Sequence, residues 1–226
     1  MLDAGEGVTR EFARRGVSPE ALRAIFISHM HADHTGGLPT LIQWLQLNER
    51  KRPLTLCLPG EAVEGFKALL SLHYLPPEWL GFELELAPVE EGPAFEEAGL
   101  TVEAIPTRHL KGVAERLKEM GDPRAGECFS YVLAFGGKRM LFSADLAQAG
   151  EVTERVRGAD LAIVELAHFT PEELGEALAG RPLPRLVVTH VIHTLEPTEA
   201  EIPERIRAGG YEGEVMVAHD GDEFSL

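Results

Sequence analysis

Six consecutive residues, His-Met-His-Ala-Asp-His at positions 29–34, carry three imidazoles and a carboxylate directly after the apolar run 24–28. The run is short and apolar, so we predict a strand that ends there. A rigid strand followed by an exposed turn fixes the direction of the side chains that come next. Imidazole and carboxylate groups together bind zinc, manganese or iron. The stretch therefore indicates half of a metal site rather than a polar turn that is rich in histidine by chance.

Three further candidate ligands stand at the ends of other apolar runs. His109, Asp145 and His190 each follow or close a run that we predict as a strand. Ligand sites are commonly built at strand ends, where the sheet meets exposed loops. A carboxylate has two oxygens, so Asp145 can bridge two cations. We expect these residues to complete a dinuclear site, in which two divalent ions lower the pKa of a bound water to about 7.

Strands and helices are mixed along the chain, which favours a layered α/β or α+β fold. The predicted strands are 24–28, 54–58, 82–89, 100–106, 129–135, 139–143, 161–166, 186–191 and 214–218, with a hairpin turning on Gly136-Gly137. The predicted helices are 39–50, 62–73, 113–120, 171–179 and 199–208. Thr170 and Glu173 form the pattern of a capping box at the start of helix 171–179. Without an evident linker or repeat, we expect a single domain over residues 1–226.

Composition narrows the class of protein. The net charge of −16 disfavours an extended nucleic-acid or anionic-membrane surface. No run of eighteen apolar residues and no signal peptide is visible, so we expect a cytoplasmic protein without a membrane span. Its two cysteines, Cys57 and Cys128, lie in apolar runs and are predicted to be reduced core residues. One asparagine, three glutamines and an excess of arginine over lysine favour a thermophilic source.

The motif at 29–34 resembles the His-x-His-x-Asp-His signature of the metallo-β-lactamase superfamily. The resemblance covers nearly the whole chain, because Asp3 in "LDAGEG", His109, "FSAD" at Asp145 and "VVTH" at His190 resemble the other motifs in order. It implies a four-layer αββα sandwich whose N-terminal strands are shortened here, since the chain opens on the aspartate motif. The implied ligands of one metal are His29, His31 and His109, those of the other are Asp33, His34 and His190, and Asp145 bridges. The implied ions are Zn²⁺, or Mn²⁺ or Fe²⁺.

Residues 2–42 are particularly similar to ribonuclease Z, which trims the 3′ side of precursor tRNA. Proteins of that family place a glutamate and a later histidine near the metals, and Glu165 and His168 in "ELAHF" resemble those two. The likeness implies a metal-bridging hydroxide as the nucleophile and three catalytic side chains. Asp33 would orient or deprotonate the nucleophile, His168 would protonate the leaving group, and Glu165 would orient the histidine ring.

Two departures from the ribonuclease Z pattern bear on the substrate. Only 35 residues separate His109 from Asp145, and the hairpin uses about half of them, so a long tRNA-gripping arm has no room. The chain also opens on the aspartate motif, so either its start was assigned too late or its first sheet is smaller than in relatives. A missing hairpin would expose a sheet edge that a second copy, in a homodimer, could cover. With the acidic charge, the missing arm favours a small phosphodiester over precursor tRNA.

Other functions of such a site stay open. The same metals could serve carbonyl chemistry in a lactonase, thioesterase or β-lactamase-like hydrolase acting on a small ester. A redox role is disfavoured, because diiron relatives carry glutamate where this chain has His31. A metal-binding protein without turnover would need a ligand or proton donor to be missing, and none is missing. We therefore predict a metal-dependent hydrolase, with phosphodiesterase activity ahead of the carbonyl alternatives.

Overall fold

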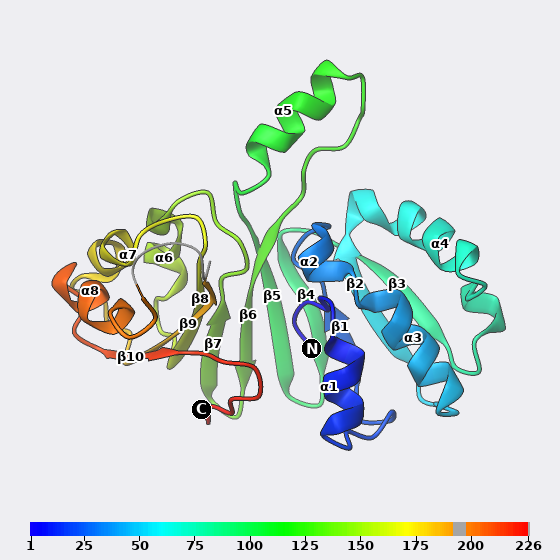
Figure 1. The fold of residues 1–226 in the computed structure, drawn as a ribbon. Coiled ribbons are helices and arrows are strands. Elements are labelled where there is room, and N and C mark those ends of the chain that lie inside the picture. The colour runs from blue at the N-terminus through cyan, green and yellow to red at the C-terminus, as the bar shows by residue number, and fades with distance from the viewer. Residues whose placement is uncertain (192–197, 226) are drawn as a thin grey trace. The chain divides into compact units, whose positions relative to one another are not determined.

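The computed structural model describes residues 1–191 and 198–225. The chain divides into two compact units, the first formed by Met1–Glu90 and Gly121–Glu127 and the second by Glu91–Met120 and Cys128–Leu226. Each unit has its own β-sheet (Figure 1). Each also has its own hydrophobic core. Within the described residues, no helix is long and apolar enough to cross a bilayer.

The first unit is built on a three-stranded parallel sheet in the order β1-β2-β3. Its strands are β1 (Ala24–Phe26), β2 (Leu54–Pro59) and β3 (Leu84–Val89). Its helices are α1 (Val8–Arg14), α2 (Ala32–Thr35), α3 (Leu38–Leu47) and α4 (Val63–Leu72), with short 3₁₀ turns η1 (Gly60–Ala62) and η2 (Pro77–Trp79). Parallel neighbours need a crossover, and α3 and α4 supply the crossovers between successive strands.

The core of the first unit follows from apolar spacing. Leu38, Leu41, Ile42 and Leu45 recur every three or four residues in α3 and are all buried, so one face of this helix packs on the sheet. The outer edge of β1 is also occupied. Leu2 forms a parallel bridge with Phe26, and the backbone of the first three residues exchanges hydrogen bonds of 2.8 and 2.9 Å with Phe26. The edge beside β1, which we expected to be bare, is therefore covered by residues 1–3.

The second unit carries a seven-stranded mixed sheet in the order β10-β9-β8-β7-β6-β5-β4. Its strands are β4 (Gly92–Glu97), β5 (Leu100–Pro106), β6 (Phe129–Phe135), β7 (Lys138–Phe142), β8 (Leu161–Leu166), β9 (Arg185–Val191) and β10 (Glu214–Val217). Its helices are α5 (Lys111–Glu119), α6 (Val152–Arg155), α7 (Pro171–Leu178) and α8 (Ile202–Ala208), with η3 (Ala149–Glu151). Strands β4 to β7 form an antiparallel meander, and β7 to β10 are parallel.

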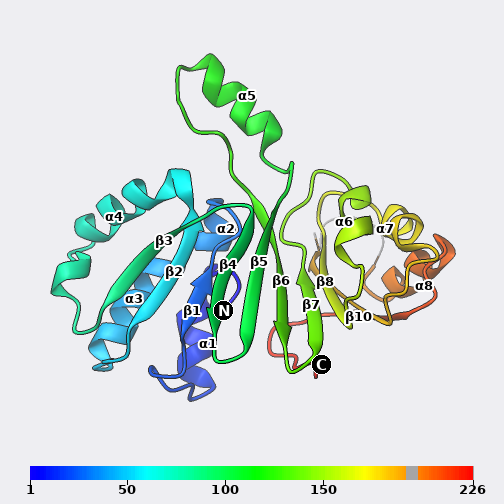
Figure 2. The ribbon, with the colours of Figure 1, turned by 180° about the vertical axis from the view of Figure 1, so that it is seen from behind.

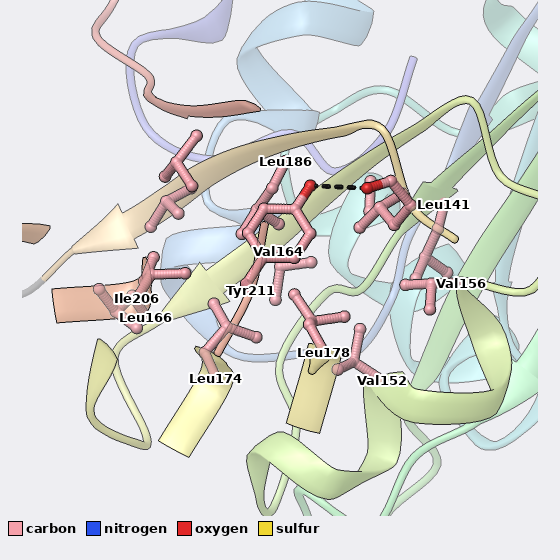
Figure 3. Close-up of a cluster of buried hydrophobic side chains, with 14 of the residues drawn as sticks. Leu141, Val152, Val156, Val164, Leu166, Leu174, Leu178, Leu186, Ile206 and Tyr211 are labelled. Atoms are coloured by element: carbon pink, nitrogen blue, oxygen red, sulfur yellow. Dashed lines mark hydrogen bonds between the residues drawn. The ribbon is translucent and has the colours of Figure 1, made fainter. Parts of the chain in front are cut away.

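Apolar side chains from β7, β8 and β9 and from α6, α7 and α8 form the core of the second unit (Figure 3). Tyr211 is buried there, and its hydroxyl donates a hydrogen bond of 3.0 Å to the carbonyl of Leu183. Helices α7 and α8 approach closely at Gly175 and Gly209. A Cβ atom at Gly175 would lie 2.0 Å from the carbonyl oxygen of Ile206, so this helix contact requires glycine.

Helix α5 extends beyond the ends of β5 and β6 in both ribbon views (Figures 1 and 2). None of its residues is buried. The chain between β5 and β6 is therefore a short projection with one helix. The prediction that a long gripping arm has no room agrees with this segment, although the sequence argument did not foresee that a short arm would form.

The predicted strands correspond to nine of the ten observed in the described residues, with ends shifted by at most two residues. Strand β4 was missed because its sequence, Gly-Pro-Ala-Phe-Glu-Glu, lacks the apolar alternation of a half-buried strand. It lies at the edge of the sheet, where proline and charged residues are tolerated. Helices α1, α2 and α6 were missed as well. Helix α8 begins at Ile202 instead of 199, and the capping box predicted at Thr170 is present.

Candidate metal centre

The histidine motif of the first unit leaves β1 and continues into the short helix α2. His29 is fully buried, and its Nε2 lies 2.9 Å from Nδ1 of His31, with the two rings nearly perpendicular at 73°. Two nitrogens on one tetrahedral zinc ion are about 3.3 Å apart, given metal–nitrogen distances near 2.0–2.1 Å. The two ring nitrogens thus converge at a separation that suits a shared divalent cation.

Asp3 holds this motif in place through hydrogen bonds to Ser28 and His34. Its Oδ2 accepts hydrogen bonds from Nδ1 of His34 at 2.7 Å and from Oγ of Ser28 at 2.9 Å, while Oδ1 accepts from the Ser28 amide at 2.7 Å. Oγ of Ser28 also lies 3.0 Å from Nδ1 of His29. An ionised carboxylate only accepts hydrogen bonds, so the Ser28 hydroxyl donates to Asp3 and accepts from His29. This network places a proton on Nδ1 of both His29 and His34 and leaves Nε2 as the coordinating atom of each ring.

Asp33 follows on the first turn of α2. Its Oδ2 lies 3.6 Å from Nε2 of His34, and its side chain is 62% exposed. The Asp33 carboxylate therefore faces Nε2 of His34, the ring nitrogen that is not hydrogen-bonded to Asp3. Ring nitrogen and carboxylate oxygen at this distance form a second pair of potential ligands beside the His29–His31 pair.

The second unit gathers its candidate residues at one edge of its sheet. Strands β5 and β7 are each antiparallel to β6, and β8 and β9 are parallel to β7, so these four strands end at the same edge. His109 follows β5, Asp145 follows β7, Glu165 lies near the end of β8 with His168 just beyond, and His190 lies near the end of β9. Strand direction therefore brings these five side chains to the same end of the sheet, as the strand pattern predicted for His109, Asp145 and His190.

The two oxygens of Asp145 face different histidines. Oδ1 lies 3.0 Å from Nδ1 of His190, and Oδ2 lies 3.5 Å from Nε2 of His109. Asp145 is 2% exposed, so its carboxylate is desolvated and needs positive partners. A carboxylate placed between two imidazoles in this way is suited to bridge two cations.

Side-chain hydroxyl and thiol groups hydrogen-bond the backbone at and near Asp145. The carbonyl of Asp145 accepts hydrogen bonds from Oγ1 of Thr107 at 3.0 Å and from Sγ of Cys128 at 3.7 Å. Oγ of Ser130 donates to the carbonyl of Ser143 at 2.6 Å, and Oγ of Ser143 accepts from the amide of Glu165 at 3.1 Å. These contacts, between residues far apart in sequence, fix the turn that presents Asp145.

Three of the six non-glycine residues with a positive φ in the described part of the chain lie in or beside the candidate site. Asp3, Ala144 and His190 adopt φ angles of 50°, 49° and 53°, in the left-handed region that residues with a Cβ atom rarely occupy. The pairing of β8 with β9 also shifts register between Glu165 and Leu166. Residues held in such backbone conformations cost of order 1–3 kcal/mol each and cluster at functional sites, and bulges beside active sites change the direction of a side chain.

Glu165 is buried and fully occupied by donors. Its oxygens accept from the amides of Leu146 and Ala167 at 2.8 Å, from the amide of His168 at 3.2 Å, and from Nδ1 of His168 at 2.9 Å. The ring of His168 is thereby held by one nitrogen. Its Nε2 has no hydrogen-bond partner within residues 1–191 and 198–225, and the side chain is 35% exposed. This is the arrangement of a positioned imidazole that can give or take a proton.

The residues present in each unit fit a divalent metal centre, since neutral imidazoles and carboxylates are the ligands of zinc, manganese and iron. Ligand atoms of Asp145, Glu165 and His190 lie within 4.8 Å of one another in the second unit. The structure thus assembles the predicted residues in two groups, His29, His31, Asp33 and His34 in one unit and His109, Asp145, Glu165, His168 and His190 in the other. That both groups serve one dinuclear site stays a prediction.

The residues that support these side chains were not predicted from the sequence. Ser28 precedes His29 in the motif and could have been noticed as a polar residue closing an apolar strand. Thr107, Ser130 and Ser143 carry no local signal, because the contacts by which they hold the turn at Asp145 join residues 13 to 38 positions apart. Cys57 and Cys128 are both buried, as predicted for core cysteines.

The family model and the known proteins that this chain matches point to the same family. Residues 1–195 match the family model described as beta-lactamase superfamily domain. The ribonuclease Z of Pyrococcus abyssi is 43% identical over 79 residues, which cover 35% of this chain and 26% of that protein. The ribonuclease Z of Methanothermobacter thermautotrophicus is 25% identical over 245 residues, covering 88% of this chain and 79% of that protein.

Solved structures with a similar fold extend over nearly the whole chain. The metallo-beta-lactamase fold protein YhfI from Bacillus subtilis superposes with a TM-score of 0.70 at 20% identity, covering 96% of this chain and 82% of the other. Human tRNase Z, short form, gives a TM-score of 0.65 at 20% identity over 97% and 85%. A diphosphatase from the PhnP family gives 0.68 at 19% identity over 100% and 79%. These likenesses confirm the predicted fold class, and the matched relatives confirm the resemblance to ribonuclease Z.

Proposed function

Because the chain belongs to the beta-lactamase superfamily domain family, we propose that it is a metal-dependent hydrolase that cleaves phosphodiesters at a ribonuclease Z-like site. The observation that carries the proposal is the Glu165–His168 pair. A buried carboxylate holds Nδ1 of His168 at 2.9 Å, while Nε2 stays available for proton transfer. A positioned proton donor of this kind is what the departure of an alkoxide from phosphorus requires. Relatives named ribonuclease Z support the assignment.

The proposed metal ligands follow the two observed groups. His29, His31 and His109 would hold one divalent ion, Asp33, His34 and His190 would hold the other, and Asp145 would bridge. The convergence of His29 and His31 and the two-sided placement of Asp145 support this division. Zinc is the preferred metal, with manganese or iron as alternatives. When bound, the ions would polarise a phosphoryl oxygen and make water more acidic at neutral pH.

The side chains have separate roles in this proposal. Asp33 would orient the attacking water or accept its proton. His168 would donate a proton to the leaving oxygen from Nε2, and Glu165 would stabilise the protonated ring through Nδ1. Water supplies the oxygen that binds phosphorus, the bond from phosphorus to the leaving oxygen breaks, and the transferred proton makes that leaving group a neutral alcohol.

A small phosphodiester is the proposed substrate class. The net charge of −16 opposes long contacts with a polyanion, and the nine-residue helix α5 is a short projection. A compact substrate can be bound by the two metals and nearby side chains without an RNA-gripping surface. We propose that the protein acts in the cytoplasm. We also propose that it can self-associate as a homodimer, which sedimentation velocity would test.

The test combines metal analysis with a substrate screen. Purified protein should contain two equivalents of divalent metal per chain, and His31→Ala should lose metal and activity together. His73→Ala is the matched control, because His73 lies exposed at the end of α4. Turnover of bis(4-nitrophenyl) phosphate should exceed turnover of lactones and thioesters. Preference for lactones or thioesters would instead support carbonyl chemistry, and metal-replete protein inactive on all of them would indicate a non-catalytic metal-binding protein.

A further inference from the structure

A cavity of about 470 Å³ opens beside His168 in the second unit. Two segments line it, the start of α5 with the residues before it and the loop after Asp145. The lining includes Arg108, His109 and Lys111 from the first segment and Gln148 from the second. The cavity therefore adjoins both a candidate metal ligand and the candidate proton donor, although no role assigned so far uses its cationic side chains.

The two cations of this cavity are not neutralised. Within residues 1–191 and 198–225, neither Arg108 nor Lys111 forms a salt bridge, and both are exposed. Their isolation contrasts with Arg155 and Arg205, which pair with glutamates. Two like charges on one wall repel each other unless an anion lies between them. In a chain of net charge −16, this positive patch would attract phosphate locally.

One buried carboxylate fixes both walls. Oε2 of Glu151 accepts a hydrogen bond from the Arg108 amide at 3.2 Å, and Oε1 accepts from the Ala147 amide at 2.9 Å. Arg155 holds Glu151 in turn, donating to its Oε2 at 3.3 Å and to the carbonyl of Pro106 at 2.7 Å. The spacing of the walls is therefore set by the fold, which preorganises the cavity for a ligand of fixed size.

We propose that this cavity is an anion subsite that binds a second phosphate group of the substrate, carried by the leaving group. The inference rests on the proposed function, because His168 would protonate the leaving oxygen and a group bound beside it belongs to that side of the scissile bond. Arg108 would bind two phosphate oxygens with its planar fork, and Lys111 would add a point charge. The substrate class is then a short phosphodiester whose leaving alcohol ends in a phosphate.

Three dinucleotides of uridine test the subsite directly. UpU carries no terminal phosphate, pUpU carries one on the nucleoside that would leave through its O3′, and UpUp carries one on the opposite side. The metal-replete enzyme should hydrolyse pUpU with a kcat/KM about tenfold or more above that of UpU, with UpUp close to UpU. Equal gains for pUpU and UpUp, or no gain for either, would overturn the subsite.

Charge-removing variants identify the residues. Arg108→Gln and Lys111→Gln should each lower the pUpU-to-UpU ratio about tenfold, mainly through KM for pUpU. Lys118→Gln is the matched control, since Lys118 is also exposed on α5 but lies outside the cavity lining. An unchanged ratio in the double variant Arg108→Gln/Lys111→Gln would refute the proposal.

A binding measurement separates failure of the subsite from failure of the proposed function. Isothermal titration calorimetry compares uridine 5′-monophosphate with uridine on the wild-type chain and the double variant. Wild-type protein should prefer the monophosphate, and the double variant should lose about tenfold or more of that preference. If no dinucleotide is hydrolysed, the proposed function fails, and the calorimetric comparison still decides the subsite. Equal preference in both proteins would overturn it.

Discussion

The carboxylate of Asp3 accepts a hydrogen bond of 2.7 Å from Nδ1 of His34, across 31 positions of sequence. Through the hydroxyl of Ser28 the same oxygen is linked to His29. One carboxylate thus sets the coordinating nitrogen of two histidines. The carboxylate also fixes their ring orientation, although it is not itself among the proposed ligands.

Replacing Asp3 by asparagine should weaken metal binding about 10- to 100-fold, the usual effect of removing a carboxylate that supports a ligand histidine. Asparagine can donate where aspartate accepts, so the proton on Nδ1 of His34 would lose its partner. Competition with a chromogenic chelator measures the affinity. Glu64→Gln removes an exposed charge on α4 and should leave the affinity unchanged. Equal affinities for Asp3→Asn and wild type would contradict the role given to Asp3.

Removal of metal should lower thermal stability as well as activity. A ligand that binds only the folded state at 100 times its Kd contributes about 2.7 kcal/mol to the free energy of unfolding. Differential scanning calorimetry before and after verified chelation measures the shift in Tm, and re-addition of Zn²⁺ should restore it. The Tm of the control variant His31→Ala should not change when the chelator is added. A wild-type Tm that does not change after complete metal removal would argue against a preformed site.

The role of His168 predicts a dependence on the leaving group. His168→Ala should reduce kcat strongly for diesters with alkoxide leaving groups, and only weakly for diesters that release 4-nitrophenolate. General acid catalysis contributes typically 10²–10⁴-fold, and a nitrophenolate departs without a proton. Steady-state kinetics with both substrate types provides the comparison. An equal loss for both types would show that His168 supports the site in another way.

The site residues that could be predicted from the sequence are those whose positions follow from the direction of the strands. His109, Asp145 and His190 could be predicted to lie together because each stands at the end of an apolar run. Parallel strands, and every second strand of an antiparallel meander, end on the same side of the sheet. Glu151 could not be found, since its partners Arg108 and Ala147 contact it only through backbone amides. Backbone donors are present at every position, so no residue type marks them.

The elements of the fold also divide into those that the sequence predicts and those that it does not. The strands of the core were predictable from continuous apolar runs, whereas β4 was missed because an edge strand exposes one side and tolerates Pro93. Helix α2 is only four residues long and begins inside the histidine motif, so it has no apolar periodicity. The close packing at Gly175 is a tertiary requirement that composition does not reveal.

The capping box of α7 gives a test of local stability. Oγ1 of Thr170 accepts the amide of Glu173 at 3.2 Å, and the Glu173 carboxylate accepts the amide of Thr170 at 2.7 Å. Thr170→Ala should cost about 1 kcal/mol in the free energy of unfolding, a fall in Tm of about 2–4 °C for a chain of this size. Thr170→Ser keeps the acceptor and should stay close to wild type. Indistinguishable Tm values for all three proteins would show that the cap contributes little.

Alkaline stability should depend on two buried acids. Burial raises the pKa of the Cys57 thiol from 9.0 to about 12, and burial raises the pKa of Tyr211 from 10.0 to about 12. Both groups are neutral when protonated, and their folded-state pKa values lie above the unfolded ones. Their contribution to stability is therefore complete below about pH 9 and is lost as pH rises toward 12.

Urea unfolding at pH 7, 9, 10 and 11 measures this loss. The wild-type free energy of unfolding should fall above pH 9, by at most about 1.4 kcal/mol per pH unit for each group, and more steeply above pH 10 when Tyr211 also contributes. Cys57→Ala removes the first group, so its decline should begin about one pH unit later. The thiol should also resist disulfide reagents at pH 8 until urea unfolds the chain, because burial keeps it protonated and shielded. Identical pH dependence in the two proteins would place the alkaline transition elsewhere in the molecule.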